Sequence, residues 1–178
     1  MNNPYKKCPI FETPRFILRL VSEEDADNLL TCYADPKAQA LFNTDGFPHN
    51  CNFATYDEML ACIKFWLMEY SQEAYVRFAV VDKFTNKAVG TIEMFGMAGE
   101  NETRDGILRL DLASAYEEKP LLKKLLGVCL ENFYSLFEVH RIASKATEQA
   151  SSRIEVLQAL GFEAGDFNGR GHYYLRSR

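Results

Sequence analysis

The sequence predicts an α+β fold, an α/β sandwich of strands and helices, on three observations. Between residues 75 and 113, three segments alternate with the period of two that is typical of strands. Segments on both sides repeat apolar residues at spacings of three and four, as helices do. No internal repeat, low-complexity tract or Pro/Gly/Ser-rich linker divides the chain, so we expect one domain over residues 1–178.

The first third of the chain predicts a strand and two helices. Phe16–Val21 has strand composition, and Ser22 followed by acidic residues 23–25 is a helix start, which predicts a helix to about residue 34. Thr55 and Glu58 have the spacing of a capping box and predict a second helix. Its apolar positions are Met59, Cys62, Ile63, Trp66 and Leu67. Turn formers at 45–50 predict a surface loop near a cleft.

The rest of the chain predicts five strands and two helices. The three period-two segments, Tyr75–Val81, Ala88–Phe95 and Gly106–Ala113, are separated by turn formers and predict antiparallel strands. Pro120 stands where a first helical residue would, and apolar residues mark one face of a helix ending near residue 137. A strand over 140–146, a helix over 153–160 ended by Gly161, and a last strand over 171–176 follow.

Composition limits the classes of function. A chain of 178 residues with 47% hydrophobic residues buries about 70% of its unfolded surface, so it needs no disulfide or metal. The 25 acidic and 20 basic residues give a net charge of -5, which disfavours a nucleic-acid partner. The N-terminus lacks the apolar run of a signal peptide, and no window reaches about 18 apolar residues. We therefore expect a cytoplasmic protein with no membrane partner.

Cysteines and histidines are too scattered to predict a metal site. The five cysteines include no Cys-x-x-Cys pair, and the three histidines at 49, 140 and 172 lie far apart in the sequence. We expect no bound metal. Cys62 and Cys129 are expected to be buried, unreactive thiols, and Phe65 and Trp66 to be core residues.

Several segments resemble the GNAT superfamily of acyl-CoA-dependent N-acyltransferases, in particular its ribosomal-protein N-terminal acetyltransferase branch. Glu12–Leu20 is similar to the opening T-x-R-L-x-L-R strand of that branch, and Val89–Glu93 resembles its central "vGxi" strand. Val156–Phe162 resembles the "vLeklGF" helix-to-strand signature. These segments occur in the family's order and span nearly the whole chain.

The resemblance implies a mixed, mostly antiparallel sheet flanked by helices, with two central strands that splay apart. In the family the pantetheine arm of acetyl-CoA lies along this gap, and its pyrophosphate sits on a helix N-terminus, where unpaired N–H groups favour anions. The family sequence there is Q/R-x-x-G-x-G/A, in which glycines allow close approach. A homodimer through an edge strand is a further expectation of the resemblance.

The segment before the long helix departs from this family pattern. Glu117 stands in place of Gln or Arg, Pro120 in place of the first Gly, and Leu122 in place of the second Gly or Ala. Pro120 removes an N–H donor, and Glu117 and Glu118 place negative charge beside the expected diphosphate. Two unit charges about 5 Å apart repel by roughly 3 kcal/mol at an effective dielectric near 20. Lys119, Lys123 and Lys124 could offset this repulsion.

A second departure lies in the following helix. The family pattern N-x-x-S-x-x-v-L-x-x-l-G-F supplies an Asn that contacts the cofactor arm and a Ser that can serve as acid, and here these positions are Ala150 and Arg153. Both departures weigh against cofactor binding.

Candidates for the chemistry of acyl transfer nevertheless exist. Glu93 lies on the strand that the family uses for a base, and a carboxylate in an apolar cleft would be more basic; a polar residue on an open sheet face is the alternative. Tyr173 and Tyr174 are candidate acids for the leaving thiolate, or half-buried strand aromatics. Arg109 and Asp111 share one strand face and could form a surface pair. The resemblance implies donor-binding positions at Leu110, Asp111, Leu112, Ala113, Lys119, Leu121, Leu122 and Lys123.

These observations leave three functions open. The first is an acetyl-CoA-dependent N-acetyltransferase acting on a primary amine, such as a protein N-terminus. The second is a non-catalytic GNAT-fold binding protein that has lost acetyl-CoA binding. The third is an enzyme that uses an acyl donor without a diphosphate, which Leu122 would tolerate better.

Overall fold

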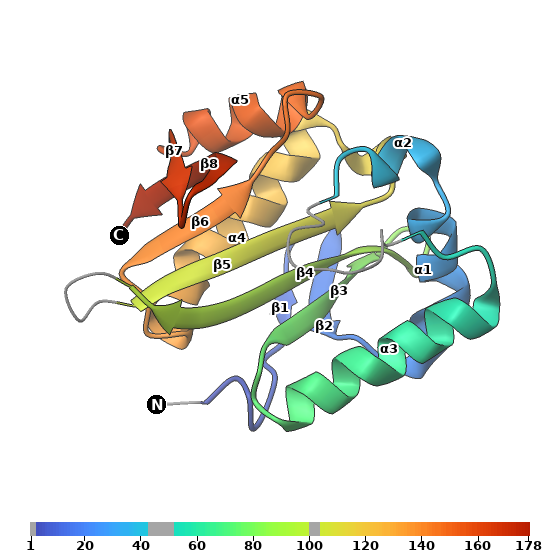
Figure 1. Cartoon of the computed structure of the whole chain (residues 1–178). Coiled ribbons are helices and arrows are strands. Elements are labelled where there is room, and N and C mark those ends of the chain that lie inside the picture. Colours follow the sequence, from blue (N-terminus) through green and yellow to red (C-terminus); the bar gives the residue numbers. More distant parts are fainter. Residues whose placement is uncertain (1–2, 43–51, 100–103) are drawn as a thin grey trace.

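The computed structural model describes residues 3–42, 52–99 and 104–178. The eight strands of these residues form one sheet in the order β1-β2-β3-β4-β5-β6-β8-β7 (Figure 1). Neighbouring strands are antiparallel, except that β5 and β6 are parallel. The mixed, mostly antiparallel sheet is thereby confirmed. Its strands are β1 (Phe11–Glu12), β2 (Phe16–Leu20), β3 (Val76–Asp82), β4 (Lys87–Ala98), β5 (Arg104–Leu112), β6 (Arg141–Lys145), β7 (Glu163–Phe167) and β8 (Arg170–Ser177).

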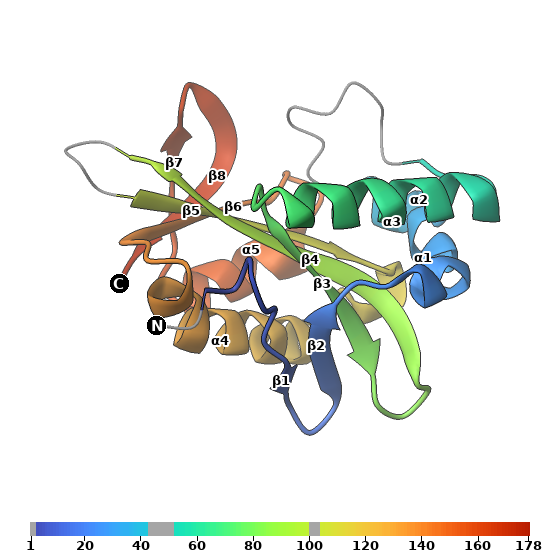
Figure 2. The same ribbon diagram turned by 90° about the horizontal axis from the view of Figure 1, so that it is seen from below.

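Helices cover both faces of the sheet. α1 (Ala26–Tyr33) and α3 (Tyr56–Ser71) lie on one face, and α4 (Lys119–Leu136) and α5 (Ser151–Ala159) lie on the other (Figure 2). The short helix α2 (Pro36–Gln39) lies beside the C-terminal end of β5, where the Asp35 carboxylate accepts a hydrogen bond from the Ser114 N–H. Within the described residues, no helix is both long and apolar enough to cross a membrane.

The predicted helix boundaries are set by local chemistry. Thr55 caps α3 by accepting the Glu58 N–H at 3.3 Å, and Glu58 accepts the Thr55 N–H at 3.0 Å, which is the predicted capping box. Pro120 lies in the first turn of α4. Gly161 follows α5 with φ +84°, a backbone conformation that glycine adopts without strain.

Two apolar layers hold the helices to the sheet. Alternate side chains of the central strands, such as Phe78, Ile92 and Leu108, pack against α4 and α5. The residues between them face α1 and α3, where Ala79 packs in a cluster with Trp66. Because the strands are covered on both faces, every residue of β3, the stretch Ala88–Met94 of β4 and every residue of β5 after Arg104 are buried, polar residues included.

The structure confirms each predicted helix and strand, and adds two strands, one short α-helix and, at Ser114–Tyr116, a 3-10 turn. β1, α2 and β7 contain two, four and five residues. β7 was missed because its residues, Glu-Ala-Gly-Asp-Phe, have neither strand composition nor alternation. The predicted loop at 45–50, with His49, lies outside the described residues.

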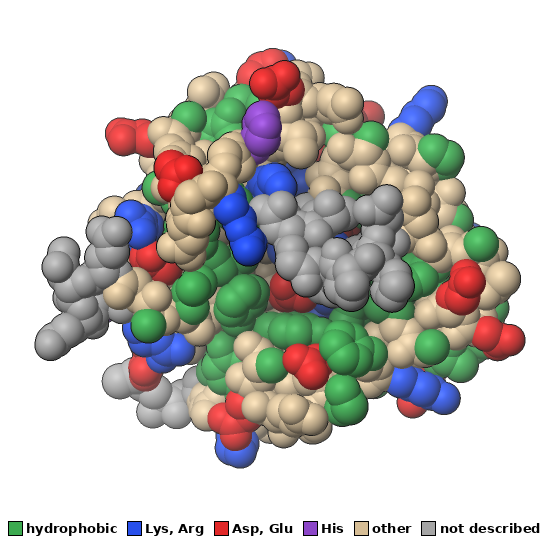
Figure 3. Space-filling model, in the orientation of Figure 1, with side chains coloured by type: hydrophobic (Ala, Val, Ile, Leu, Met, Phe, Trp, Pro, Cys, Tyr) green, Lys and Arg blue, Asp and Glu red, His purple; other side chains and the backbone are tan. Residues whose placement is uncertain are grey.

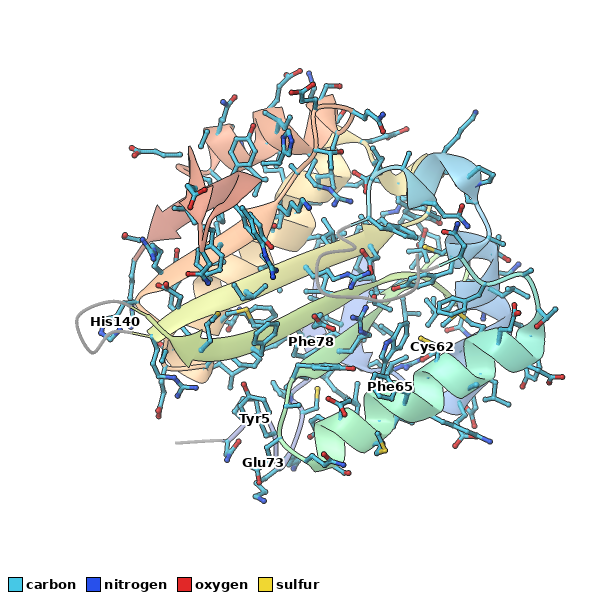
Figure 4. All side chains as sticks on the ribbon, viewed as in Figure 1. Tyr5, Cys62, Phe65, Glu73, Phe78 and His140 are labelled. Carbon is cyan, nitrogen blue, oxygen red and sulfur yellow. The ribbon has the colours of Figure 1, made fainter. Side chains whose placement is uncertain are left out.

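Two expectations about α3 need correction. Phe65 is not a core residue, because 46% of its surface is exposed, and Cys62 is only partly buried (Figure 4). The apolar face of α3 is centred on Met59, Ile63 and Trp66, and Phe65 lies beside this face rather than on it. Cys129 on α4 is buried as expected.

β4 and β5 approach each other too closely at Gly90 to admit a side chain. A Cβ atom there would lie 2.2 Å from the Asp111 carbonyl oxygen and 2.8 Å from the Leu112 Cα. Both contacts are to backbone of the neighbouring strand, so no rotamer change can relieve them. The glycine of the Val89–Glu93 segment therefore has a packing reason in this chain.

We predict that Gly90→Ala lowers the free energy of unfolding by about 2 kcal/mol or more, because it overpacks two backbones. Gly127→Ala in α4 is the matched control, since a Cβ there meets nothing within 4 Å. Alanine is favoured over glycine in a helix interior by about 1 kcal/mol, so this variant should gain stability. Urea unfolding measures both. Equal effects of the two variants would contradict the role given to Gly90.

Candidate active site

Four charged side chains line the face of the central strands that lies under α1 and α3. Arg77, Glu93 and Arg109 are direct cross-strand neighbours on β3, β4 and β5. Thr91 and Asp111 form the adjacent pair on the same face. Strand alternation therefore brings residues from three separate segments into one row.

Hydrogen bonds and ion pairs join this row into a closed network. The Arg77 guanidinium pairs with Glu93 and donates to Thr91 at 3.0 Å, and lies 3.4 Å from the Asp111 carboxylate. Arg109 Nε donates to Asp111 at 2.9 Å, and so does the Tyr33 hydroxyl at 3.0 Å. Two cations and two anions share the site, so its formal charge is zero. We name Arg77, Glu93, Arg109 and Asp111 the buried quartet.

Burial strengthens these interactions. Arg77 is 1% exposed, and its guanidinium lies 4.2 Å from the ring centroid of Trp66, a cation–π contact. Burial alone would disfavour the charged form, but the carboxylate of Glu93, followed by Tyr33 and Asp111, raises the pKa of Arg77. Burial, with the Asp111 carboxylate, raises the pKa of Tyr33 well above its usual value. Arg77 therefore stays charged, and Tyr33 stays a donor.

The sequence predicts an Arg109–Asp111 pair at the surface, and this placement is wrong. The pair exists, but Arg109 and Asp111 are 3% and 0% exposed. Glu93 likewise does not lie on an open sheet face, since it is 5% exposed and paired with Arg77. Alternation identified the shared face, but it could not show that α3 covers this part of it.

A pocket of about 390 Å³ opens beside the buried quartet. Glu93 and Arg109 reach it from the sheet, and Tyr173 reaches it from β8. We name it the aromatic pocket, after the rings of Tyr75, Phe95, Phe167 and Tyr173; Met97, Ile107, Asn168 and Arg170 complete it. In Figure 3, apolar side chains flank the middle of this face, with charged side chains between them.

The aromatic pocket brings together two of the three predicted catalytic residues, Glu93 and Tyr173. Tyr174 follows Tyr173 on β8 and therefore turns to the opposite face, where it packs against the core beneath α4. The pairing of β7 with β8 shifts register between Gly165 and Phe167, next to the residue that pairs with Tyr173. His140 is exposed at the start of β6, at the end of the sheet away from α2, and His172 is exposed as well (Figure 4).

Sequence reasoning missed Tyr75 as a residue of this pocket. Its hydroxyl is buried and has no hydrogen-bond partner among the described residues. Burial raises the pKa of Tyr75, so the phenol keeps its proton. Tyr75 directly precedes β3, and its place beside Glu93 depends on the folded position of β4, which no local pattern reveals.

The strand β5 separates from β6 next to the aromatic pocket. The last parallel pair joins Leu108 with Ser144, whereas β5 continues to Leu112. The Ala113 N–H donates to the Val89 carbonyl, so the odd-numbered residues of this stretch bond to β4. The peptide groups of Leu110 and Leu112 therefore point toward the side of β6, beyond its last pair. This is the splay that the resemblance implies.

The side chains of the predicted donor-binding residues point in several directions. Leu110, Leu112, Leu121 and Leu122 are buried in the core against α4, and Asp111 belongs to the buried quartet. Ala113 is partly buried, and Lys119 and Lys123 are exposed on the first turns of α4. For the buried leucines, contact with a donor would fall to their peptide groups.

The N-terminus of α4 offers few free donors. Pro120 has no N–H, and the N–H groups of Leu121 and Leu122 both donate to the Glu118 carbonyl oxygen, at 3.0 and 2.9 Å. Lys119 forms an exposed ion pair with Glu155 of α5. The residues of this turn fit a diphosphate less well than the glycine-rich family sequence does.

The two departures from the family pattern contact each other. Glu117, just before α4, forms an ion pair with Arg153 of α5. Arg153 is 1% exposed and also donates to the Leu41 carbonyl oxygen at 3.1 Å. The expectation that Glu117 adds an unbalanced negative charge is therefore revised, because Arg153 neutralises it. Sequence reasoning missed this pair, since Glu117 and Arg153 are far apart in the chain and belong to different motifs.

Within residues 3–42, 52–99 and 104–178, no group of three or more His, Cys, Asp or Glu side chains is placed to hold a metal ion. What this face brings together is a carboxylate, a phenol and an arginine at one pocket, and an open strand edge next to it. This arrangement suits proton transfer to and from an elongated ligand.

Comparison with known proteins identifies the class. The family model described as "Acetyltransferase (GNAT) domain" matches residues 15–163, so the chain belongs to the GNAT acetyltransferase family. It is thereby an acyl-CoA N-acyltransferase, and the family's donor is acetyl-CoA.

Individual relatives are distant in sequence. The uncharacterized N-acetyltransferase YoaA of Bacillus subtilis (strain 168) is 17% identical over 155 residues, which cover 87% of this chain and 83% of the relative. The ribosomal-protein-S5-alanine acetyltransferase of Vibrio fischeri superposes with a TM-score of 0.72 at 18% identity, over 95% of this chain and 96% of that one. A ribosomal L7/L12 α-N-protein acetyltransferase in complex with coenzyme A gives 0.72 at 13% identity, over 95% and 98%. At these identities the solved structures show the shared fold.

We predict that Arg77→Met lowers the free energy of unfolding by about 3 kcal/mol or more, because it leaves the carboxylates of Glu93 and Asp111 buried without their shared cation. Arg104→Met is the matched control. The ion pair of Arg104 with Glu138 spans 4.0 Å with both side chains about half exposed, so its loss should cost less than about 1 kcal/mol. Chemical denaturation measures both, and similar losses would show that the network adds little.

Proposed function

We propose that this chain, as a single domain over residues 1–178, transfers the acetyl group of acetyl-CoA to a primary amine bound in the aromatic pocket. One observation carries the proposal. Arg109, which lines the pocket, is also the first residue of β5 beyond the last pair with β6. The aromatic pocket therefore adjoins the place where β5 separates from β6. An acyl group held along β5 there would face an amine bound beside Glu93.

The donor supplies an acetyl thioester when it is bound. The outward peptide groups of Leu110 and Leu112 fit the amide groups of a pantetheine arm, because they lie where a strand partner would otherwise bond. Lys119 and Lys123, exposed at the start of α4, would contact its phosphates.

Within the pocket, the proposed proton transfers fall to two residues. Glu93 accepts a proton from the substrate ammonium, which makes the amine a nucleophile. The amine nitrogen attacks the thioester carbonyl carbon and the C–S bond breaks. The Tyr173 hydroxyl donates a proton to the leaving thiolate, and the second proton of the acylated nitrogen restores that hydroxyl. Arg77 positions Glu93 through their ion pair. A guanidinium can hold both oxygens of a carboxylate, so the carboxylate has little freedom to rotate.

The acceptor we propose is the N-terminal amine of a protein. Aromatic rings next to a carboxylate attract an ammonium group through cation–π and ionic interactions, as Tyr75, Phe95 and Tyr173 would around Glu93. The names of two structural relatives, a ribosomal-protein-S5-alanine acetyltransferase and a ribosomal L7/L12 α-N-protein acetyltransferase, support the same class of acceptor.

A protein that has kept the fold but lost donor binding is the alternative. It rests on Glu117, Pro120, Leu122 and Ala150, and the pairing of Glu117 with Arg153 weakens the first of these arguments. Calorimetric titration with acetyl-CoA decides between the two functions. Saturable binding supports the enzyme, whereas no heat and no thermal shift at millimolar acetyl-CoA would establish the alternative.

We predict that Glu93→Gln lowers kcat by about 100-fold, because it removes the proton acceptor but keeps the shape of the side chain. Coenzyme A release in the presence of a peptide amine measures the rate, and acetyl-CoA affinity should change little. Glu131→Gln, on the exposed side of α4, is the control with the same change in charge. Full activity of Glu93→Gln would remove Glu93 from the mechanism.

We predict that Tyr173→Phe lowers kcat by about 100-fold, because the phenylalanine cannot protonate the thiolate. Tyr174→Phe makes the same chemical change one residue further along β8, on the opposite face, and should have an effect at least tenfold smaller. The reverse order of the two effects would assign the acid to Tyr174.

A further inference from the structure

Arg153 is a deeply buried cation close to the connection between β5 and α4. We name the stretch from the open edge of β5, at Leu110 and Leu112, to the first turn of α4 the donor groove, because it is where we place the donor. Arg153 lies near the start of α5, is 1% exposed, and joins two other segments by pairing with Glu117 and donating to the Leu41 carbonyl oxygen. The neighbouring Lys119–Glu155 pair also connects α4 with α5, but its side chains are more than half exposed. Of these two ion pairs, the Glu117–Arg153 pair is the buried one.

Buried polar atoms that lack a partner within the described ranges occur in this pair and in the turn before α5. Among the described residues, Arg153 Nε has no hydrogen-bond partner, although the atom is buried. The buried hydroxyl of Thr147, in the turn between β6 and α5, is also without a partner there. Buried polar groups are normally bonded, so atoms like these mark a place where a polar ligand could bind.

We propose that Arg153 binds the diphosphate of the acyl donor, and that Glu117 holds Arg153 in place while the donor is absent. This inference rests on the proposed function. The loop position at which the family carries Gln or Arg carries Glu117 here, and the cation comes instead from α5. Arg153 therefore supplies, from the other side of the groove, the charge that the loop has lost.

The first turn of α4 explains why such a cation is needed. Pro120 lacks an N–H, and the N–H groups of Leu121 and Leu122 are already bonded to the Glu118 carbonyl oxygen. A diphosphate near this turn would meet few free backbone donors, the charge of Glu118, and two lysines, Lys119 and Lys123, that are exposed to water. A guanidinium matches phosphate oxygens with a planar set of donors, so one arginine can replace several backbone contacts.

The exchange of partners keeps Arg153 paired at every stage. A buried guanidinium without an anion is costly, and Glu117 removes that cost in the free protein. When the donor binds, phosphate oxygens replace the Glu117 carboxylate. Glu117 lies in the connection that precedes α4, next to the exposed Glu118, so its side chain can turn to solvent.

The test compares coenzyme A with pantetheine, which lacks the diphosphate and the nucleotide, by calorimetric titration of the whole chain. Wild type should bind coenzyme A at least tenfold more tightly than pantetheine. In Arg153→Ser, which restores the family's residue, coenzyme A affinity should fall by about tenfold or more while pantetheine affinity stays the same. Thermal melting checks that the variant is folded.

The matched pair Glu117→Gln and Glu118→Gln tests the same point without removing the arginine. Both remove one negative charge from adjacent positions, but only Glu117 contacts Arg153. Glu117→Gln should tighten coenzyme A binding by about tenfold, because Arg153 is released to the phosphates, and Glu118→Gln should tighten it by no more than about twofold. If Arg153→Ser does not fold, this pair decides.

Several outcomes would overturn the inference. Tighter binding of both ligands by Arg153→Ser would show that Arg153 only blocks the groove. Equal effects of the two glutamine variants would show a general charge effect. Equal affinity of wild type for coenzyme A and pantetheine would exclude a diphosphate site but leave acetyl transfer intact. Binding of neither ligand, with no transfer, would overturn the proposed function itself and this inference with it.

Discussion

The charge of Arg77 is the constraint on which the rest of this structure depends. A guanidinium that is 1% exposed must be balanced where it lies, because an unpaired charge in the interior is very costly. Its partners come from β4 and β5, and the Trp66 ring that covers it comes from α3. Tyr33 ties α1 to the same network. One cation thus fixes how the helices of this face sit on the sheet.

The need to balance the charge of Arg77 also holds the proposed catalytic base in place. The carboxylate that balances Arg77 is Glu93, which reaches the aromatic pocket, so the proposed base is held by the same contact that stabilises the fold. The donor side follows the same logic beyond the C-terminal end of β5. There Arg153 is balanced by Glu117, and the anion that replaces Glu117 in our proposal is part of the substrate. In this proposal the Arg77–Glu93 pair persists, whereas the Arg153–Glu117 pair is exchanged when the donor binds.

Local patterns in the sequence were sufficient to predict most of the fold. Capping chemistry placed α3 and α4, and alternation placed β3, β4 and β5, because these signals act within a few residues. β7 escaped because its residues carry no such pattern. In the site, Glu93 and Tyr173 were predicted from the family resemblance, but their shared pocket was not, since it depends on how the β7–β8 hairpin packs against β4. Glu117 and Arg153 were each noticed as departures, and only the fold shows that they compensate each other.

The adjacent tyrosines of β8, Tyr173 and Tyr174, lie on opposite faces of the sheet. Neighbouring side chains of a strand point to opposite faces, so a slip by one residue exchanges what the strand presents to each side. Here such a slip would replace Tyr173 with Tyr174 and still bring a phenol to the aromatic pocket. The hairpin already contains an irregular register between Gly165 and Phe167, where changes in strand length are most easily absorbed. The same slip would also exchange every other side chain of β8 between the two faces, so the packing of Tyr173 on the Phe167 ring helps to fix the observed register.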